Sequence, residues 1–214
     1  MNVAAESLLL DFDAQIAQRH TALLVVDMQN DFCAAAGYID RIVKGDLTAC
    51  RMVVQPITDL LSAARSAAVP VFWLRANYDR DLIPEPMLAN LLRQGIAEVC
   101  CAPGSWGADW YGVAPQPGEP VIEKHCYSGF RGTDLHQRLQ QRGIRTLVFS
   151  GVQTHVCVES TLRDAHSLGY YCVVPEDCVG SHARAAHQAT LATIQALFGD
   201  VCAATSIVNA WASA

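Results

Sequence analysis

Apolar stretches and amphipathic stretches alternate along the chain, and this alternation predicts strands and helices in turn. Apolar, β-rich runs predict buried strands at residues 21–28, 69–76, 120–124, 145–152, 170–177 and 200–208. Helical spacing of apolar residues predicts helices at 51–67, 133–143, 155–169 and 183–199. Thr133 is the expected cap of the second helix, and the last three helices are expected to close at Gly143, Gly169 and Gly199. Strands that alternate with helices of this length predict a doubly wound α/β fold, in which right-handed crossovers place helices on both faces of a parallel sheet.

The region from residue 77 to 120 breaks this alternation, because it is rich in proline and shows no sustained period. We therefore expect an excursion and loop there. No internal repeat or linker marks the rest of the chain. A length of 214 residues fits a single α/β domain over residues 1–214, with a core from about residue 21 to 205.

Composition narrows the class of partner and the compartment. A net charge of -6, without any cluster of Lys and Arg, argues against nucleic-acid binding. Nine cysteines, an odd number at irregular spacing, form no disulfide framework and indicate a reduced, cytoplasmic protein. The first fifteen residues lack the basic region of a secretory signal, and no apolar run reaches membrane-spanning length. We therefore expect a small-molecule substrate, with no nucleic acid and no membrane as partner.

Three reactive side chains stand at the ends of predicted strands, on the edge of the sheet where ligands bind in this kind of fold. Asp27 ends the first strand, Lys124 ends the third, and Cys157 lies in the first helical turn after the fourth. Each residue alone has an ordinary explanation, as a cap, a surface residue or a small buried residue. Their joint placement predicts one crevice, because the carboxyl ends of parallel strands meet at one edge.

The three groups suit acyl transfer through a covalent intermediate. Cys157 provides the nucleophile, and we expect the Lys124 cation and the helix N-terminus to lower the pKa of its thiol toward neutrality. Asp27 accepts the thiol proton, passes it to the departing nitrogen, and later takes a proton from the attacking water. The backbone amides of Gln153 and Cys157, in the turn from strand to helix, are the candidate oxyanion hole.

Other chemistries fit the residues less well. His155 stands two positions before Cys157, and side chains two apart on a helix do not face each other, which disfavours a Cys-His dyad. The adjacent Cys100 and Cys101 are spaced too tightly for a zinc site, and no Cys-x-x-Cys pair occurs. No glycine-rich turn follows the first strand, which argues against a bound dinucleotide. The sequence thus predicts neither a metal nor a cofactor.

Around these residues the chain resembles the isochorismatase-like cysteine hydrolases. The resemblance rests on LLVVDMQNDF at the first strand, EKHCYSGFRGTDL around Lys124 and SGVQTHVCVESTLRDAHSLGY around Cys157, and it spans residues 21 to about 205. It implies a six-stranded parallel sheet, a triad of Asp27, Lys124 and Cys157, and a cis peptide bond between Val152 and Gln153.

The resemblance also narrows the reaction. Isochorismatases proper typically carry glycine where Cys157 stands, so the thiol favours acyl transfer over ether cleavage. Nicotinamidases carry an Asp-x-His metal motif, which the stretch 73–85 lacks. The segments DFCAAAGYID, YSGFRGT and VCVESTLRDA are most similar to ureidoacrylate, biuret or triuret, and N-carbamoylsarcosine hydrolases. This implies cleavage of a small linear amide or ureide with release of ammonia or carbamate. The alternatives are a maleamate- or nicotinamide-type amidase, or a non-catalytic binding or thiol-redox module on the same fold.

Residues that flank the triad or follow strand ends are candidates for binding the substrate. They are Phe32, Trp73, Asn77, Tyr127 and Gln153. Arg75 and Arg80 are alternatives that could pair with a substrate carboxylate. The resemblance further implies a homo-oligomer, either a dimer or a tetramer, and the apolar C-terminal segment at 206–214 could pack on a neighbouring subunit.

Overall fold

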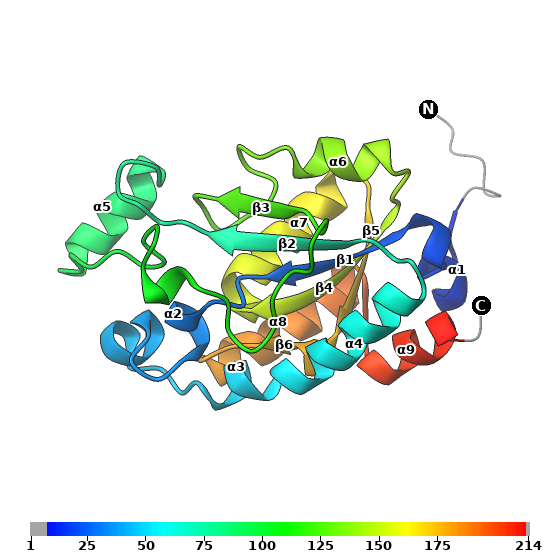
Figure 1. The fold of residues 1–214 in the computed structure, drawn as a ribbon, viewed down its shortest axis with the longest axis horizontal. Coiled ribbons are helices and arrows are strands. Elements are labelled where there is room, and N and C mark those ends of the chain that lie inside the picture. Colours follow the sequence, from blue (N-terminus) through cyan, green and yellow to red (C-terminus); the bar gives the residue numbers. More distant parts are fainter. Residues whose placement is uncertain (1–7, 213–214) are drawn as a thin grey trace.

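The computed structural model describes residues 8–212 and is built around one sheet in which every strand pairing is parallel (Figure 1). Six strands follow the order β3-β2-β1-β4-β5-β7, and a two-residue seventh strand, β6, pairs with the end of β4. The fold class that the sequence predicts is confirmed. Outside the described residues lie the first seven residues of the N-terminal stretch and the last two of the C-terminal segment. The strands are β1 (Thr21–Val26), β2 (Val71–Ala76), β3 (Val121–Lys124), β4 (Thr146–Val152), β5 (Tyr171–Pro175), β6 (Val179–Gly180) and β7 (Asp200–Cys202).

Helices cover both faces of the sheet. On one face α4 (Val54–Ser66) and α9 (Ala204–Ala212) share a core with Leu23 and Val25 of β1. On the other, α6 (Leu135–Gln141), α7 (Glu159–Ser167) and α8 (Arg184–Leu197) share a core with Leu24 and Val26. Because successive residues of β1 enter opposite cores, this strand is apolar at nearly every position. The shorter elements are α1 (Phe12–Gln15), α2 (Asn30–Cys33), α3 (Thr48–Met52), α5 (Glu85–Arg93), π-helical turns at 39–43 and 154–158, and 3-10 turns at 18–20, 106–108 and 176–178.

The prediction of a last strand over residues 200–208 is wrong beyond residue 202. β7 ends at Cys202, and α9 begins two residues later. Ile207 and Trp211 are four residues apart, so they share one helix face, and both are buried in the core beside α4. The Trp211 indole also donates a hydrogen bond to the carbonyl oxygen of Ile16 at 2.9 Å. The described part of the C-terminal segment therefore packs within its own chain, where the sequence suggested contact with a neighbouring subunit.

The proline-rich region 77–120 is not loop throughout, because it contains α5 and the 3-10 turn at 106–108. Pro84 takes the N-cap position of α5 and Pro86 lies in its first turn, where the absent N–H groups would have no helical partner. Proline therefore stands at the start of a helix here, where the sequence pattern predicts a loop.

The predicted ends of the other helices hold in part. The helix expected over 51–67 is divided into α3 and α4. Asp134, not Thr133, takes the N-cap position of α6, although the Thr133 hydroxyl accepts a hydrogen bond from the Leu135 amide at 3.3 Å. Gly143 follows α6 with φ of 64°, in the left-handed region that favours glycine after a helix.

The connections of β1 define where a site can form. β2 and β3 lie on one side of β1, and β4, β5 and β7 lie on the other, so the strand order reverses direction at β1. Such a switch point opens a crevice at the carboxyl ends of the strands. β2 lies between β1 and β3, which places its carboxyl end between Asp27 and Lys124. Over residues 8–212, no helix is both long enough and apolar enough to cross a membrane.

Candidate active site

Asp27 follows β1 directly and is completely buried. Its φ of 51° lies in the left-handed region, which aspartate adopts more readily than most residues. Its amide donates to the carbonyl oxygen of Leu74 at 3.0 Å and so continues the pairing with β2. The side chain of Gln29 then accepts from the Ala76 amide at 2.8 Å and donates to the Ala76 carbonyl at 3.0 Å. These bonds hold the turn that carries Asp27 against the end of β2.

Lys124 ends β3 and forms a buried ion pair with Asp27. Its Nζ lies 2.8 Å from Asp27 Oδ2, and both side chains are 0% exposed. The ammonium also donates to the hydroxyl of Tyr78 at 2.9 Å and to the carbonyl oxygen of Cys126 at 3.1 Å. The opposite charge of Lys124 is the main interaction that stabilises this buried carboxylate.

Cys157 lies in the π-helical turn 154–158 that follows β4, as the sequence predicted for the first turn of this helix. It is only 3% exposed. The peptide bond between Val152 and Gln153 is cis, which confirms the expectation drawn from the resemblance. The His155 ring is turned to another partner, since its Nδ1 lies 2.8 Å from the hydroxyl of Ser181.

Two close contacts hold the turn that carries Cys157 in place. Gly151 has φ of 107°, and a Cβ atom there would stand 2.0 Å from the carbonyl oxygen of Val26, so β4 approaches β1 too closely for any side chain. In the helix that follows, the Thr161 hydroxyl donates to the Cys157 carbonyl at 2.6 Å and accepts from the Gly129 amide at 3.0 Å. The thiol-bearing turn is thus tied both to β1 and to the loop after β3.

Tyr78 joins the predicted groups, and the sequence interpretation missed it. Its hydroxyl lies 3.3 Å from Cys157 Sγ and 2.9 Å from Lys124 Nζ, so it stands between the thiol and the ammonium. The available signal was its place two residues after β2, the strand between those that end at Asp27 and Lys124. At this strand end the sequence predicts Asn77 as a site residue, and not its neighbour Tyr78.

Burial dominates the ionisation of the site. It raises the pKa of the Cys157 thiol to about 12, although the Lys124 ammonium opposes the rise. It also raises the pKa of Asp27, again against Lys124. Burial alone would lower the pKa of Lys124, but the charges of Asp27 and Cys157 together outweigh it and raise that pKa. The expectation of a thiol pKa lowered toward neutrality is therefore wrong for the free protein, because desolvation of the sulfur outweighs the nearby cation.

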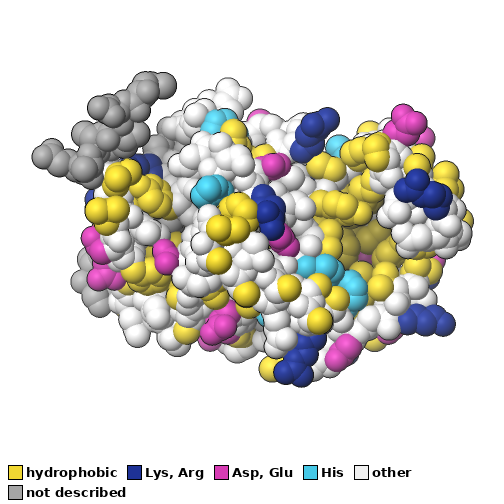
Figure 2. All heavy atoms as spheres, turned by 180° about the vertical axis from the view of Figure 1, so that it is seen from behind, with side chains coloured by type: hydrophobic (Ala, Val, Ile, Leu, Met, Phe, Trp, Pro, Cys, Tyr) yellow, Lys and Arg dark blue, Asp and Glu magenta, His cyan; other side chains and the backbone are white. Residues whose placement is uncertain are grey.

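Two further aromatic rings pack around Tyr78, beside the thiol. The ring of Tyr78 packs edge to face against Phe32 and Tyr127, with centroid distances of 6.4 Å and 6.3 Å. Tyr127 is 40% exposed and borders a groove of about 440 Å³ beside α5. Figure 2 shows hydrophobic side chains gathered in a hollow at this end of the molecule. The groove is lined by Pro84, Pro86, Met87, Asn90, Arg93, Cys126 and Tyr127.

Two of the predicted substrate-binding residues are held elsewhere. Trp73 is fully buried within β2, three residues before the strand ends, and its indole donates to Glu119 at 2.7 Å. Asn77 donates to Glu123 at 3.0 Å and accepts from the Asp79 amide at 3.2 Å. The structure places Phe32 and Tyr127 around Tyr78 but does not bring the side chains of Trp73 and Asn77 to the thiol.

The side chain of Gln153 is also fully engaged. Its oxygen accepts from the backbone amide and from Nδ1 of His182, both at 2.9 Å. Its nitrogen donates to the Phe32 carbonyl at 3.4 Å and to Cys50 Sγ at 3.3 Å. What remains at the site is the backbone amide of Gln153, for which the described residues supply no hydrogen-bond acceptor.

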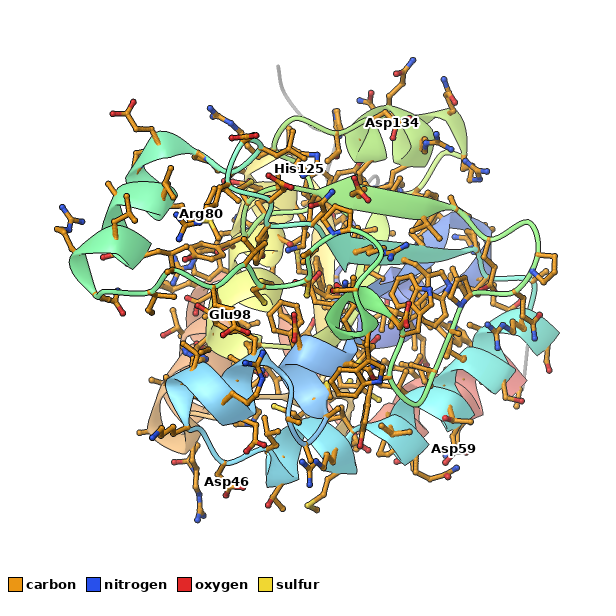
Figure 3. The ribbon with its side chains drawn as sticks, turned by 60° about the vertical axis from the view of Figure 1, so that its left-hand side comes forward. Asp46, Asp59, Arg80, Glu98, His125 and Asp134 are labelled. Atoms are coloured by element: carbon orange, nitrogen blue, oxygen red, sulfur yellow. The ribbon has the colours of Figure 1, made fainter. Side chains whose placement is uncertain are left out.

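The two arginines that were alternatives for binding a carboxylate also have partners. The guanidinium carbon of Arg75 lies 6.0 Å from the centre of the Trp110 ring. Arg80 lies beside α5 (Figure 3) and donates to the carbonyl oxygens of Ile96 and Ala97 at 3.3 Å and 2.7 Å. Arg80 therefore holds the loop after α5, at the same end of the molecule as the groove.

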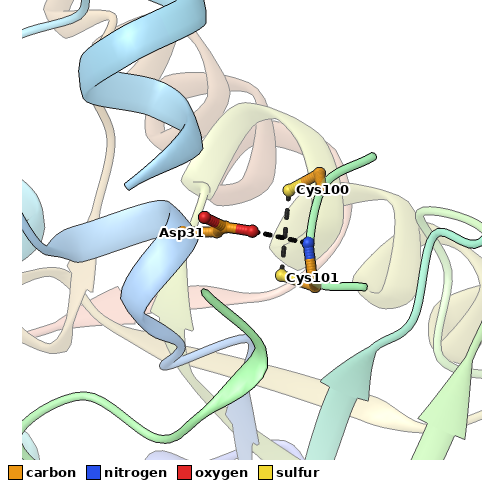
Figure 4. A group of neighbouring side chains, drawn as sticks. All are labelled: Asp31, Cys100 and Cys101. Atoms are coloured by element: carbon orange, nitrogen blue, oxygen red, sulfur yellow. Dashed lines mark hydrogen bonds between the residues drawn. The ribbon is translucent and has the colours of Figure 1, made fainter. Parts of the chain in front are cut away.

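One group of possible metal ligands lies among the described residues, namely Asp31, Cys100 and Cys101 (Figure 4). The two sulfurs are 3.7 Å apart. Both oxygens of Asp31 already accept backbone hydrogen bonds, from Tyr38 at 3.0 Å and from Cys101 at 2.6 Å. The carboxylate therefore acts as a link between α2 and the loop after α5, and hydrogen bonding accounts for its burial.

A parallel α/β sheet with a carboxylate, an ammonium and a thiol at its switch point is the arrangement of the isochorismatase-like cysteine hydrolases. The chain belongs to the isochorismatase family, because the model of the Isochorismatase domain matches residues 21–206. The resemblance drawn from the three motifs is thus confirmed.

Relatives and solved structures agree with this assignment. A ureidoacrylate amidohydrolase, RutB, of Stutzerimonas stutzeri is 37% identical, in an alignment that covers 91% of this chain and 84% of that protein. A cysteine hydrolase from Pseudomonas syringae is similar in structure, with a TM-score of 0.80, 29% identity, and coverage of 93% of this chain and 95% of that one. An N-carbamoylsarcosine amidase from Thermoplasma acidophilum has a TM-score of 0.69 and 27% identity, covering 86% and 96% of the two chains.

Proposed function

We propose that this chain is a cysteine-dependent amidohydrolase that cleaves a carbon–nitrogen bond of a small linear amide or ureide. The observation that carries the proposal is the buried group of Asp27, Lys124 and Cys157 at the switch point of the sheet. Relatives named as a ureidoacrylate amidohydrolase and an N-carbamoylsarcosine amidase support the class of bond.

The reaction begins with the neutral thiol. As the sulfur of Cys157 attacks the carbonyl carbon, its proton passes to Asp27, whose raised pKa makes it a stronger base than an ordinary carboxylate. Lys124 stays charged throughout and stabilises negative charge on the sulfur. Asp27 then returns the proton to the departing nitrogen, the carbon–nitrogen bond breaks, and a thioester remains on Cys157.

Water completes the cycle with the same groups. The oxygen of a water molecule attacks the thioester carbon while Asp27 accepts a proton from that water. The carbon–sulfur bond breaks, and the proton passes to the sulfur of Cys157, which restores the thiol and the carboxylate. The products are an acid, or carbamate from a ureido group, together with ammonia or an amine.

Negative charge on the carbonyl oxygen needs donors in both half-reactions. We assign this role to the backbone amides of Gln153 and Cys157, which belong to the turn between β4 and α7. The Gln153 amide supports the assignment, because it has no acceptor among the described residues and is free to donate.

The groove beside α5 is the proposed entrance for the substrate. Tyr127 borders it, and the ring of Tyr78 lies between Tyr127 and the thiol. A volume of about 440 Å³ suits a small molecule. Flat aromatic rings at Phe32 and Tyr127 suit a planar ureido or amide group better than a bulky substrate.

Release of ammonia from a substrate panel tests the proposal. The panel contains ureidoacrylate, N-carbamoylsarcosine, biuret, maleamate and nicotinamide, each incubated with the wild type, with Cys157→Ala and with Cys172→Ala. Cys172 is a matched control, since its thiol is buried against Leu162 and Tyr170, away from Lys124. We expect turnover of a linear ureide or amide by the wild type and Cys172→Ala, and none by Cys157→Ala.

Other results would contradict the proposal. Full turnover by Cys157→Ala would exclude covalent catalysis by this thiol. Binding of panel members without turnover would favour a binding module, and turnover of nicotinamide alone would favour that type of amidase. Loss of activity on addition of a chelator would contradict a mechanism that needs no metal.

We further propose that the protein is cytoplasmic and forms a homo-oligomer. All nine cysteines are unpaired thiols, which supports a reducing compartment. Light scattering tests the assembly, and a monodisperse monomer would contradict it.

A further inference from the structure

The hydroxyl of Tyr78 occupies the space between the ammonium and the thiol, and the mechanism above gives it no task. We propose that Tyr78 is a catalytic residue, whose hydroxyl donates a hydrogen bond to the Cys157 sulfur whenever that sulfur is negatively charged. The proposal rests on the proposed function, in which Cys157 is the nucleophile.

The direction of each hydrogen bond follows from the groups involved. An ammonium has no acceptor, so Lys124 must be the donor in its 2.9 Å contact with the Tyr78 oxygen. The single phenolic hydrogen is then left for another partner. Two acceptors are within reach, the carbonyl oxygen of Cys126 at 3.4 Å and the sulfur of Cys157 at 3.3 Å.

The charge of the sulfur decides between these two acceptors. A neutral thiol is a weak acceptor, so the phenol donates to the Cys126 carbonyl in the free protein. A thiolate is a charged acceptor, and hydrogen bonds to charged groups are roughly twice as strong as neutral ones. When the Cys157 proton passes to Asp27, rotation about one C–O bond turns the phenolic hydrogen to the sulfur. No heavy atom has to move, and Tyr78 neither gains nor loses a proton.

The surroundings of Tyr78 fit a donor that stays protonated. The side chain is buried, and burial raises the pKa of the phenol well above its ordinary value. Lys124 Nζ lies 5.1 Å from the centre of the Tyr78 ring, so the ammonium contacts both the ring and the hydroxyl. Phe32 and Tyr127 pack on the ring from other directions. The hydroxyl is thereby held at one position.

The test is the pH dependence of alkylation at Cys157, measured with iodoacetamide and read by peptide mass spectrometry. Only the thiolate reacts, so the rate at a given pH reports how well the charged sulfur is stabilised. In Tyr78→Phe we expect the profile to move to higher pH by about one to two units, which slows alkylation about 10- to 100-fold at a fixed pH. Tyr170→Phe is the matched control, since its buried hydroxyl bonds to His136 and not to a thiol. Its profile should coincide with that of the wild type.

A profile for Tyr78→Phe that coincides with the wild type would overturn the proposal. If Tyr78→Phe does not fold, 3-fluorotyrosine at position 78 replaces it, because a more acidic phenol is a stronger donor and should move the profile to lower pH. No displacement with the fluorinated residue would equally overturn the proposal. Alkylation requires no substrate, whereas the ammonia assay measures turnover. A failure of the proposed amidohydrolase activity can therefore be told apart from a failure of the proposed role of Tyr78.

Discussion

Removal of the charge on Asp27 should destabilise the fold strongly, because Lys124 would remain buried without a counter-ion. At 2.8 Å and an effective dielectric constant of about 20, the attraction between the two charges is about 6 kcal/mol. Desolvation offsets part of this, and loss of one partner of a buried pair costs about 3–5 kcal/mol. We therefore expect Asp27→Asn to lower the free energy of unfolding by about 3–5 kcal/mol, or the melting temperature by roughly 6–20 °C.

A double-mutant cycle separates the interaction between Asp27 and Lys124 from the effect of replacing each residue alone. In Asp27→Asn/Lys124→Met both charges are gone, and replacement of a buried ion pair by neutral groups is often close to neutral in stability. The double variant should thus regain most of the loss, to within about 2 kcal/mol of the wild type. Asp59→Asn is the control, since Asp59 is exposed on α4 and its change should stay within about 0.5 kcal/mol.

The single variant should also acquire a distinctive dependence on pH. Without Asp27, burial is the largest influence on Lys124 and lowers its pKa in the folded state below the unfolded value near 10.5. Between these two pKa values the unfolded chain binds more protons than the folded one, so the stability of Asp27→Asn rises with pH.

Urea unfolding monitored by circular dichroism at pH 7 and pH 9.5 measures both effects. An Asp27→Asn variant as stable as the wild type, or a double variant no more stable than Asp27→Asn, would refute the account of a coupled buried pair.

Three further substitutions test other parts of the structure. Gly151→Ala should cost at least about 3 kcal/mol, because its Cβ would stand 2.0 Å from a carbonyl oxygen of β1, and thermal melting that matches the wild type would contradict this close approach. Trp73→Phe should lower the free energy of unfolding by about 1–3 kcal/mol through loss of its hydrogen bond to Glu119. Its KM should stay unchanged, and a raised KM would indicate that Trp73 contacts the substrate. Thr161→Val removes the bonds that tie the turn of Cys157 to the loop after β3, so we expect kcat to fall about tenfold, and unchanged kinetics would show that these bonds do not position the thiol.

The sequence predicted the central sheet and the meeting of three reactive side chains at its edge because both follow from simple physical rules. Buried parallel strands are apolar on both faces, and their carboxyl ends meet at one edge, which brings Asp27, Lys124 and Cys157 together. The segment 200–208 was misjudged because a short apolar run fits a strand or a buried helix equally well, and only packing on α4 decides for α9.

The finer features of the site depend on information that the residue pattern does not contain. Trp73 belongs to the strand that ends beside the site, but the register places it three residues inside the sheet. Tyr78 reaches the thiol through the path of the loop after β2, which no periodicity describes. The raised pKa of Cys157 reflects its near-complete burial, and the extent of burial becomes visible only when all the packed elements are known.

The central claim is that the sulfur of Cys157 carries the acyl group during turnover. Rapid acid quench of the wild type during hydrolysis of an accepted ureide, followed by mass spectrometry of the intact protein and its peptides, measures this directly. The account predicts an added mass equal to the acyl portion of the substrate, located on Cys157 and absent from Cys157→Ala. Steady turnover with an unmodified Cys157 peptide at every quench time, together with activity in Cys157→Ala, would contradict it.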